Sequence, residues 1–324
     1  MSKRRINKQQ SKRIELIQAS YQQPSNSDQQ DNYAGLVIMR HSRHAVIEDE
    51  QGNRIHSSIR PHIDSLVAGD RVIWQKEGDN QGIVVSRLDR QSELGKVDGR
   101  GNVRAVAANI TQLIAVFAPK PAMTWPLLDN YTIIAELLGL RLLIVLNKTD
   151  LHCDDIKIQL QNIYQKLDYR VLYTNNQESQ SYLCLEDCLK NEVSVFVGQS
   201  GVGKSSLIST ILPHEDTIIT GEISASSELG CHTTSNSRYY HLPNGGALID
   251  SPGVREFSLG QLAKKDTLYG FREFRRLAHQ CKFRNCNHLN SPGCEILRSV
   301  ESGENSSQRY DNFIKLYAQV VTSQ

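Results

Sequence analysis

Between residues 33 and 90, apolar and polar positions alternate in short runs that are separated by turn residues. Alternation with a period of two predicts strands that bury one face, and glycine-containing turn signals stand at 52–53, 69–70 and 78–79. We predict strands at residues 35–41, 45–49, 55–59, 71–75 and 83–88. Such short strands suit a small closed barrel of the OB type, a fold that commonly binds oligonucleotides. A generic small β-domain would show the same alternation.

After residue 109 the pattern changes to nearly continuous apolar runs, each followed by a stretch with helical character. Apolar strands that alternate with helices are typical of a parallel sheet covered on both faces. The predicted strands are residues 113–118, 141–146, 170–173 and 193–197, and the predicted helices are residues 126–138, 154–167 and 181–190. A Pro-Asn-Gly-Gly turn between residues 241–242 and 247–249 predicts a β-hairpin attached to this sheet. From about residue 260 onward the pattern is helical.

The composition is ordinary for a soluble globular protein, with 39% hydrophobic and 22% charged residues among 324. No run approaches the ~18 consecutive apolar residues of a membrane span, and no apolar segment follows the basic N-terminus, so we expect neither a membrane protein nor an exported one. Three of the seven cysteines cluster with a histidine, which here predicts a metal site rather than a disulfide framework. We therefore expect a cytoplasmic protein.

The net charge of +2 is too small to indicate nucleic-acid binding by itself, but positive charge is concentrated at the N-terminus. The basic residues there are Lys3, Arg4, Arg5, Lys8, Lys12 and Arg13. A polar stretch follows at residues 22–32, with too little apolar surface to fold. Residues 1–32 are therefore predicted to be a flexible arm, which is either a solubilising tail or an RNA-binding arm.

A phosphate-binding loop is indicated by a full match to G-x-x-x-x-G-K-[ST] between a predicted strand and a helical run at 204–212. Its glycines let backbone N–H groups approach phosphate oxygens closely. We predict that Lys204 reaches the β- and γ-phosphates of a nucleotide and that Ser205 ligates Mg²⁺. The predicted nucleotide-binding residues here are Gly198, Gln199, Ser200, Gly201, Val202, Gly203, Lys204, Ser205 and Ser206.

An N-K-x-D sequence, formed by Asn147, Lys148, Thr149 and Asp150, directly follows the strand predicted at 141–146. A carboxylate in the plane of the base accepts from N1–H and the N2 amino group of guanine, whereas adenine offers no such pair of donors. Asp150 is therefore the predicted specificity residue for GTP and GDP. Lys148 is expected to pack its stem against the base, and Asn147 to steady the loop. A solvated turn fits the tetrapeptide alone, but less well beside a full phosphate loop.

Asp250 and Gly253 match D-x-x-G after the strand expected at 247–249. We predict that Asp250 holds Mg²⁺ through water and that the Gly253 N–H contacts the γ-phosphate. The segment between this motif and the phosphate loop carries Thr233 and Thr234. Either threonine can supply a second hydroxyl to Mg²⁺.

The order of these motifs along the chain is rotated. A conventional GTPase has the phosphate loop first and N-K-x-D last, but here residues 147–150 precede residues 198–205 and 250–253. The sheet survives such a rotation because the termini of a domain usually lie close together. We predict a multidomain chain with an OB-fold RNA-binding barrel at 33–92, a circularly permuted α/β P-loop GTPase domain at 105–258 and a helical zinc-binding domain at 259–324.

Cys281, Cys286, His288 and Cys294 offer three thiolates and one imidazole within a short segment. Four nitrogen and sulfur ligands without an open position predict one structural zinc ion rather than a catalytic one. Free cysteines buried in a helical segment are the alternative. The surrounding basic residues suit a phosphate backbone, or equally a solvated helix face: Arg272, Arg275, Arg276, Lys282 and Arg284.

Taken together, the motifs resemble the RsgA/YjeQ family of circularly permuted GTPases over nearly the whole chain. The closest matches are Gly-Gln-Ser-Gly-Val-Gly-Lys-Ser-Ser at 198–206, Asp-Ser-Pro-Gly-Val-Arg-Glu-Phe at 250–257 and the cysteine–histidine spacing. The resemblance implies a factor in late maturation of the 30S subunit, and we expect a monomer. It would bind 16S rRNA through the barrel and the zinc domain and hydrolyse GTP for its release. Ser235 departs from the third threonine of the family's switch loop, and Thr174-Asn175 match its second guanine-contacting motif poorly.

The hydrolysis chemistry is predicted partly from Val254, which follows Gly253 where many GTPases carry a water-orienting glutamine. An apolar side chain cannot orient the attacking water, so we expect slow intrinsic hydrolysis. His232 in the switch loop is the candidate catalytic residue, and the family resemblance supports it. A loop histidine without a catalytic role is the alternative.

Two other functions fit parts of this pattern. The first is a nucleotide-gated RNA-binding module in which hydrolysis is incidental. The second is a phosphotransferase, because many P-loop proteins transfer phosphate to small acceptors. The combination of N-K-x-D, D-x-x-G and the switch threonines argues against the phosphotransferase.

Overall fold

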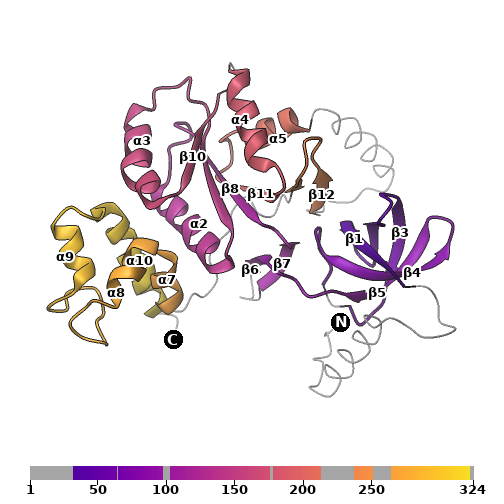
Figure 1. Cartoon of the computed structure of the whole chain (residues 1–324), viewed down its shortest axis with the longest axis horizontal. Helices are drawn as coiled ribbons and strands as arrows, with labels where there is room; N and C mark the ends of the chain where they lie inside the picture. The colour runs from indigo at the N-terminus through magenta and orange to yellow at the C-terminus, as the bar shows by residue number, and fades with distance from the viewer. Residues whose placement is uncertain are drawn as a thin grey trace.

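The computed structural model describes residues 32–63, 65–97, 103–175, 178–212, 237–250 and 264–321. Figure 1 shows three parts in chain order, which are a small β-barrel, a central sheet with helices on both faces, and a group of helices at the C-terminal end. The arm predicted at 1–32 lies outside the described residues except for Asn32, which begins the first strand.

The barrel consists of the strands β1 (Asn32–His41), β2 (His44–Glu48), β3 (Arg54–Ile59), β4 (Arg71–Gly78) and β5 (Gln81–Arg87). The predicted alternation is confirmed because apolar side chains of these strands point inward and form one core, including Val37, Ile47, Val72 and Val84. β1 pairs with both β2 and β4, β3 runs parallel to β5, and β5 pairs with β4. These pairings close the sheet into the expected OB-type barrel.

A second hairpin follows the barrel, in a segment for which we predicted no strands. It consists of β6 (Glu93–Val97) and β7 (Val103–Ala108). Its residues lack a clear alternation because glycine, alanine and charged residues dominate them. The hairpin is held against the barrel at Gly69, whose φ is 89° and whose Cβ, if it had one, would lie 2.2 Å from the Ala108 carbonyl oxygen. The close approach of two backbones therefore fixes this hairpin to the barrel.

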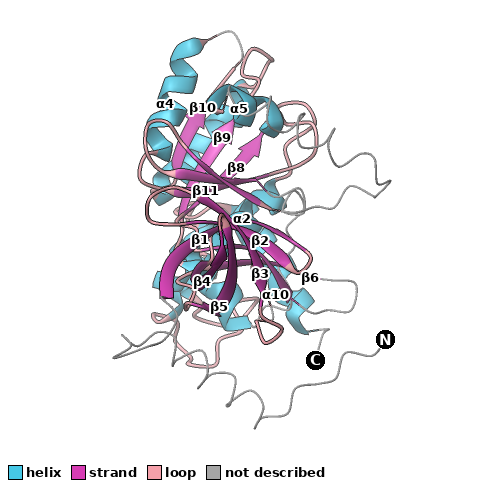
Figure 2. Cartoon of the chain, turned by 90° about the vertical axis from the view of Figure 1, so that its right-hand side faces the viewer, coloured by secondary structure: helices cyan, strands magenta, loops and turns pink. Residues whose placement is uncertain are grey.

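The central sheet contains β8 (Gln112–Phe117), β9 (Arg141–Leu146), β10 (Arg170–Tyr173), β11 (Val193–Val197), β12 (Arg238–His241) and β13 (Ala247–Asp250). Their order is β10-β9-β8-β11-β13-β12, and all neighbours are parallel except the predicted hairpin of β12 and β13. The edge strand β12 also pairs with β1, which joins the sheet to the barrel. Figure 2 shows the two β structures one above the other, seen from the barrel side.

Helices cover both faces of this sheet, which explains why its strands read as continuous apolar runs. Side chains of β8 alternate between two cores: Leu113 and Phe117 face α2 (Trp125–Leu138), whereas Ile114 and Val116 face α4 (Ser179–Leu189) and α5 (Lys204–Ile211). The helix predicted at 154–167 is α3 (Asp154–Gln159) followed by a π-turn (Leu160–Tyr164) and a 3-10 turn (Gln165–Leu167).

The C-terminal part is helical, as predicted, and packs beside α2 (Figure 1). Its helices are α7 (Lys264–Gly270), α8 (Arg272–Ala278), α9 (Glu295–Glu301) and α10 (Ser307–Val321). Phe271, Phe274 and Phe313 form its core together with Ile133 of α2. Within the described residues, no helix is both long enough and apolar enough to cross a membrane.

Candidate nucleotide and metal sites

The phosphate loop lies between β11 and α5, and its glycines have backbone conformations that other residues rarely adopt. The φ angles are 139° at Gly198, 82° at Gly201 and 100° at Gly203. A Cβ on Gly198 would lie 2.2 Å from the Val116 carbonyl oxygen, and a Cβ on Gly203 would lie 2.3 Å from Asn147 Nδ2. Glycine is therefore required both by the backbone angle and by the neighbouring chain.

Lys204 begins α5 and is buried, with its ammonium held over the loop. Its Nζ donates to the Gly198 carbonyl at 2.6 Å and to the Gln199 carbonyl at 2.5 Å. Ser205 and Ser206 follow in the exposed first turn of the helix. Val202 is buried beneath the loop, whereas Ser200 and Gly201 are exposed. Backbone N–H groups at a helix N-terminus beside an ammonium form an anion-binding arrangement.

The N-K-x-D residues lie against this loop, although about fifty residues separate the two motifs in the sequence. Asn147 is buried at 2% exposure, and its Nδ2 donates to the Val202 carbonyl at 3.0 Å. Lys148 has a φ of 59°, and its Nζ donates to the Gly201 carbonyl at 2.6 Å. Asn147 thus ties the two motifs together below the surface, and Lys148 ties them together above it.

Asp150 lies at the exposed end of the same turn. Thr149 anchors that turn, because its backbone N–H and its hydroxyl both donate to the Thr174 carbonyl at 3.2 Å. The side-chain hydroxyl of Thr174 in turn donates to Asn147 Oδ1 at 3.0 Å. The carboxyl ends of β9, β10 and β11 therefore bring together the phosphate loop, the N-K-x-D turn and the segment that starts at Thr174.

Thr174 was not among the predicted site residues because its pair with Asn175 matched the family motif poorly. The structure places Thr174 directly against the N-K-x-D turn and fully buries it. The available signal was positional, since Thr174 follows the strand next to the one that precedes Asn147. A second contact that the sequence did not predict joins Gln199 Nε2 to Thr124 Oγ1 at 2.8 Å. Thr124 is the N-cap of α2, so the phosphate loop is bonded to the start of that helix.

Asp250 is the last residue of β13, which runs parallel to β11 with Ile249 opposite Val195. The carboxyl ends of adjacent parallel strands meet at one edge of a sheet, so Asp250 lies on the side that carries the phosphate loop. The predicted residues His232, Thr233, Thr234 and Gly253 lie outside the described residues.

The cysteine–histidine cluster brings its four side chains together at one point. One ligand atom from each of Cys281, Cys286, His288 and Cys294 lies within 4.8 Å of the others. His288 Nδ1 lies 3.7 Å from Cys281 Sγ and 3.8 Å from Cys294 Sγ. Tetrahedral ligands at zinc bond lengths are roughly 3.5–3.8 Å apart. The donor set and its spacing therefore fit a four-coordinate zinc ion.

The surroundings of the cluster hold its ligands in place. Cys294 is the N-cap of α9, and its Sγ accepts from the Leu297 N–H at 3.5 Å. The Tyr310 hydroxyl donates to the His288 carbonyl at 2.8 Å. Burial lowers the pKa of His288, which favours the neutral imidazole that a metal requires. Burial also raises the pKa of Cys294 to about 11, and a bound cation would oppose this by stabilising the thiolate.

The basic residues around the cluster fall into two groups. Arg272 lies in the joint with the central domain, where it pairs with Glu136 and stacks over the ring of Tyr169 at 3.9 Å. Arg275 contacts the same carboxylate at 3.6 Å. The exposed basic residues near the cluster are Arg276, Lys282 and Arg284.

Comparison with known proteins agrees with this geometry. The model of the RsgA GTPase family matches residues 87–260. A protein of Alcanivorax borkumensis named small ribosomal subunit biogenesis GTPase RsgA is 40% identical, over 98% of this chain and 96% of its own. A protein of Haemophilus influenzae with the same name is 38% identical, over 98% and 95%.

Two solved structures share the architecture. YjeQ from Thermotoga maritima superimposes with a TM-score of 0.74 and 29% identity, covering 90% of this chain and 99% of that one. YloQ, described as a circularly permuted GTPase, superimposes with a TM-score of 0.71 and 24% identity, covering 93% and 99%. At that identity the likeness to YloQ shows the fold alone.

Proposed function

The chain belongs to the RsgA GTPase family, and from this premise we propose that it acts in the biogenesis of the small ribosomal subunit. It binds the 30S subunit with GTP bound, and hydrolysis to GDP and phosphate releases it. The observation that carries this proposal is the meeting of the phosphate loop with the N-K-x-D turn through Asn147 and Lys148. A protein that bound phosphate alone would not need the second motif there.

The guanine base lies at the N-K-x-D turn, and the phosphates lie over the loop at residues 198–206. Asp150 accepts from the guanine N1–H and N2 amino group, and Lys204 turns from its carbonyl partners toward the β- and γ-phosphates. Ser205, one of the threonines Thr233 and Thr234, and Asp250 through water hold Mg²⁺, with Gly253 at the γ-phosphate. The exposure of Ser205 and the position of Asp250 at the same sheet edge support these roles.

Hydrolysis depends on a group that becomes positioned only on the ribosome. Val254 supplies no polar atom for the attacking water, and His232 is the residue we assign to that role. The protein alone therefore hydrolyses GTP slowly, and the 30S subunit accelerates this hydrolysis.

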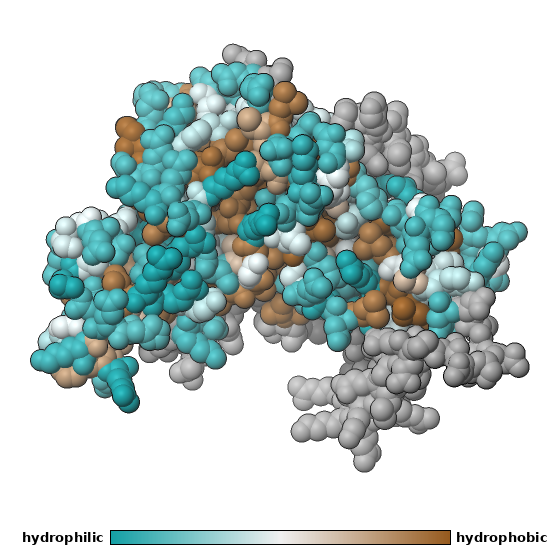
Figure 3. All heavy atoms as spheres, in the orientation of Figure 1, coloured by the Kyte–Doolittle hydropathy of each residue, from teal (hydrophilic) through white to brown (hydrophobic). Residues whose placement is uncertain are grey.

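The barrel (33–92) and the helical domain (259–324) contact 16S rRNA, and one structural zinc ion holds the helical domain together. The exposed Arg276, Lys282 and Arg284 support RNA contact, as does the mainly hydrophilic face of the helical domain in Figure 3. The arm (1–32) supplies further positive charge. The protein acts as a monomer in the cytoplasm, where its ribosomal partner is found.

The test is GTP and ATP hydrolysis by the purified chain, alone and with equimolar 30S or 50S subunits. The proposal predicts strong stimulation by 30S with GTP only. Equal rates with and without 30S would contradict it and would favour a nucleotide-gated RNA-binding protein. The His232→Ala variant should keep GTP binding and lose the stimulation, and full stimulated turnover in that variant would remove His232 from the mechanism.

A further inference from the structure

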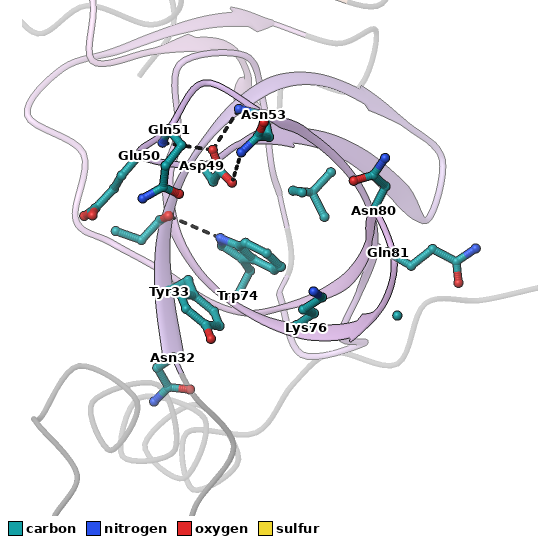
Figure 4. A pocket seen from close by; sticks show the side chains of 13 residues that line it. Asn32, Tyr33, Asp49, Glu50, Gln51, Asn53, Trp74, Lys76, Asn80 and Gln81 are labelled. Atoms are coloured by element: carbon teal, nitrogen blue, oxygen red, sulfur yellow. Dashed lines mark hydrogen bonds between the residues drawn. The ribbon is translucent and has the colours of Figure 1, made fainter.

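The open end of the barrel contains a pocket of about 500 Å³ that lies apart from the nucleotide and metal sites. It is formed by the start of β1, the β2–β3 loop and the β4–β5 loop (Figure 4). The residues that line it include Tyr33, Trp74, Lys76, Asp49, Asn53 and Asn80. Pockets of this size accept ligands on the scale of a nucleotide.

Two aromatic rings form one wall of this pocket and are held in fixed positions. The ring centroids of Tyr33 and Trp74 are 5.2 Å apart. Trp74 is 5% exposed and its Nε1 donates to the Ala34 carbonyl at 3.2 Å, whereas Tyr33 is 41% exposed. A Cβ on Gly35 or Gly82 would lie 3.0 or 2.7 Å from the indole ring, so these glycines make room for it. Trp74 thus packs beside Tyr33 and supports its ring.

The lining of the pocket combines one lysine ammonium with several amide side chains and two carboxylates. The Asp49 carboxylate is engaged in its own turn, because it accepts from the Gln51 and Asn53 backbones and from Asn53 Nδ2 at 2.8–3.0 Å. Glu50 points away from the pocket in Figure 4, whereas the Lys76 ammonium points toward it. Among the described residues, no side-chain hydrogen bond or ion pair involves Lys76. The amides of Gln51, Asn53 and Asn80 line the rim.

We propose that this pocket binds a single unpaired nucleotide of RNA, with its base stacked on Tyr33 and its phosphate at Lys76. Aromatic rings stack on any base, and amide side chains can both donate to base edges and accept from them. A lysine ammonium provides the phosphate contact. A cationic protein segment fits less well, because Lys76 would repel it and the Asp49 oxygens are already used. The inference rests on the proposed function in that rRNA supplies the nucleotide.

The chain contains only two tryptophans, Trp74 and Trp125, which allows a local measurement. In a Trp125→Phe background, Trp74 emission reports on the pocket. Titration of the full chain with hexanucleotides of adenosine or uridine should quench this emission. Tyr33→Ala should weaken binding about tenfold, because stacking on one ring is lost, and Tyr33→Phe should bind like the parent. An unchanged thermal midpoint in Tyr33→Ala verifies that the barrel stays folded.

Lys76→Gln should lower the slope of log affinity against log salt by about 0.7, the contribution of one phosphate contact to a single strand. The matched control is Lys96→Gln, which removes an exposed lysine on β6 outside the pocket and should leave Trp74 quenching unchanged. Absence of quenching, or equal affinity of Tyr33→Ala and its parent, overturns the proposal.

Hydrolysis with 30S subunits separates this inference from the proposed function. Stimulated GTP hydrolysis without quenching by the oligonucleotides would overturn the pocket proposal and leave the function standing. Quenching without stimulation would keep the RNA site and contradict the ribosomal role. A third outcome is also informative. The parent chain would show no quenching by the oligonucleotides, but Tyr33→Ala would lose affinity for the 30S subunit. That result would assign the pocket to a ribosomal protein and overturn the RNA proposal.

Discussion

The central domain holds the barrel and the helical domain by different kinds of contact. The barrel is joined mainly through backbone: β1 pairs with β12 at Met39 and Arg238, and Ala108 donates to the Ala68 carbonyl at 3.1 Å. A side-chain pair at this joint, His241 with Glu48 at 2.7 Å, is partly exposed. The helical domain is joined instead by charged side chains that are removed from water.

The buried joint is centred on Arg309 of α10, which is 1% exposed. Its guanidinium donates to Asp129 of α2 at 2.5 Å and pairs with Glu273 of α8. Asp129 also accepts from Tyr164 at 2.8 Å and from Asn312. Burial opposes the charge of Arg309, but the two carboxylates outweigh it and hold its pKa well above the usual value. Burial raises the pKa of Asp129, against the opposing effect of Arg309.

Because of this difference, the barrel and the helical domain cannot move with equal freedom relative to the central domain. A surface ion pair contributes about 0–1 kcal/mol, whereas removing one partner of a buried pair costs about 3–5 kcal/mol. Displacement of α10 from α2 would break the hydrogen bonds of Arg309 and Asn312 to Asp129, so we expect the helical domain to follow α2. Because Thr124, the N-cap of α2, accepts a hydrogen bond from Gln199 of the phosphate loop, the helical domain is also connected to the nucleotide site.

Metal removal should produce the largest effect and should act on the helical domain alone. Structural zinc sites contribute about 10–16 kcal/mol of apparent binding energy, so Cys294→Ser or chelation should unfold that domain. Limited proteolysis should then cleave within residues 264–321 and spare the barrel. The matched control is Cys184→Ser, an exposed cysteine outside the cluster. Equal resistance of the two variants would contradict the zinc assignment.

Arg309→Met should be the most damaging single change at the joint itself. It leaves Asp129 and Glu273 buried without their cation, and we expect a loss of about 3–5 kcal/mol in the free energy of unfolding. Urea denaturation followed by circular dichroism measures this loss. Arg298→Met removes an arginine whose side chain is 76% exposed and should cost less than about 0.5 kcal/mol. A similar cost for both variants would show that burial does not strengthen this joint.

Gly203→Ala tests the contact between the phosphate loop and Asn147 in the central domain. The new Cβ would lie 2.3 Å from Asn147 Nδ2 and would require a φ near 100°, so the loop or Asn147 must move. Alanine is strained at this φ, and a displaced Asn147 would lose its hydrogen bond to the Val202 carbonyl. We therefore expect GDP to bind about 100-fold more weakly, as measured by calorimetry. Gly139→Ala is the control, because Gly139 has a φ of 64° with no atom near its Cβ position. Normal GDP affinity in Gly203→Ala would refute the role of this contact.

Glu48→Gln at the barrel joint should have the smallest effect, below about 1 kcal/mol, because its histidine partner is more than half exposed. Thermal unfolding of the full chain measures it. A loss as large as that of Arg309→Met would mean that the barrel is held as firmly as the helical domain, which would remove the contrast between the joints.

The sequence predicted those parts of the fold whose pattern repeats locally. Strands such as β8 are buried on both faces and therefore read as apolar runs, and the phosphate loop and cysteine cluster are short enough to be recognised by spacing. The hairpin of β6 and β7 was missed because its backbone contacts with Gly69 leave no apolar pattern.

The buried joint could not be predicted for a different reason. Arg309 lies in a helix rich in polar residues, a composition that is typical of a solvent-exposed helix. Its partner Asp129 is 180 residues away in the sequence. Only tertiary packing shows that the two side chains share a dry environment. Thr174 is similar, since its role follows from the adjacency of β9 and β10 rather than from its own residue type.

We propose that the bound nucleotide decides whether the chain stays on the small ribosomal subunit. Co-sedimentation of the full chain with 30S subunits, in GDP or in a non-hydrolysable GTP analogue, tests it most directly. We expect the chain to pellet with 30S subunits in the presence of the analogue and to remain in the supernatant with GDP. Equal recovery with 30S in both nucleotides would contradict it.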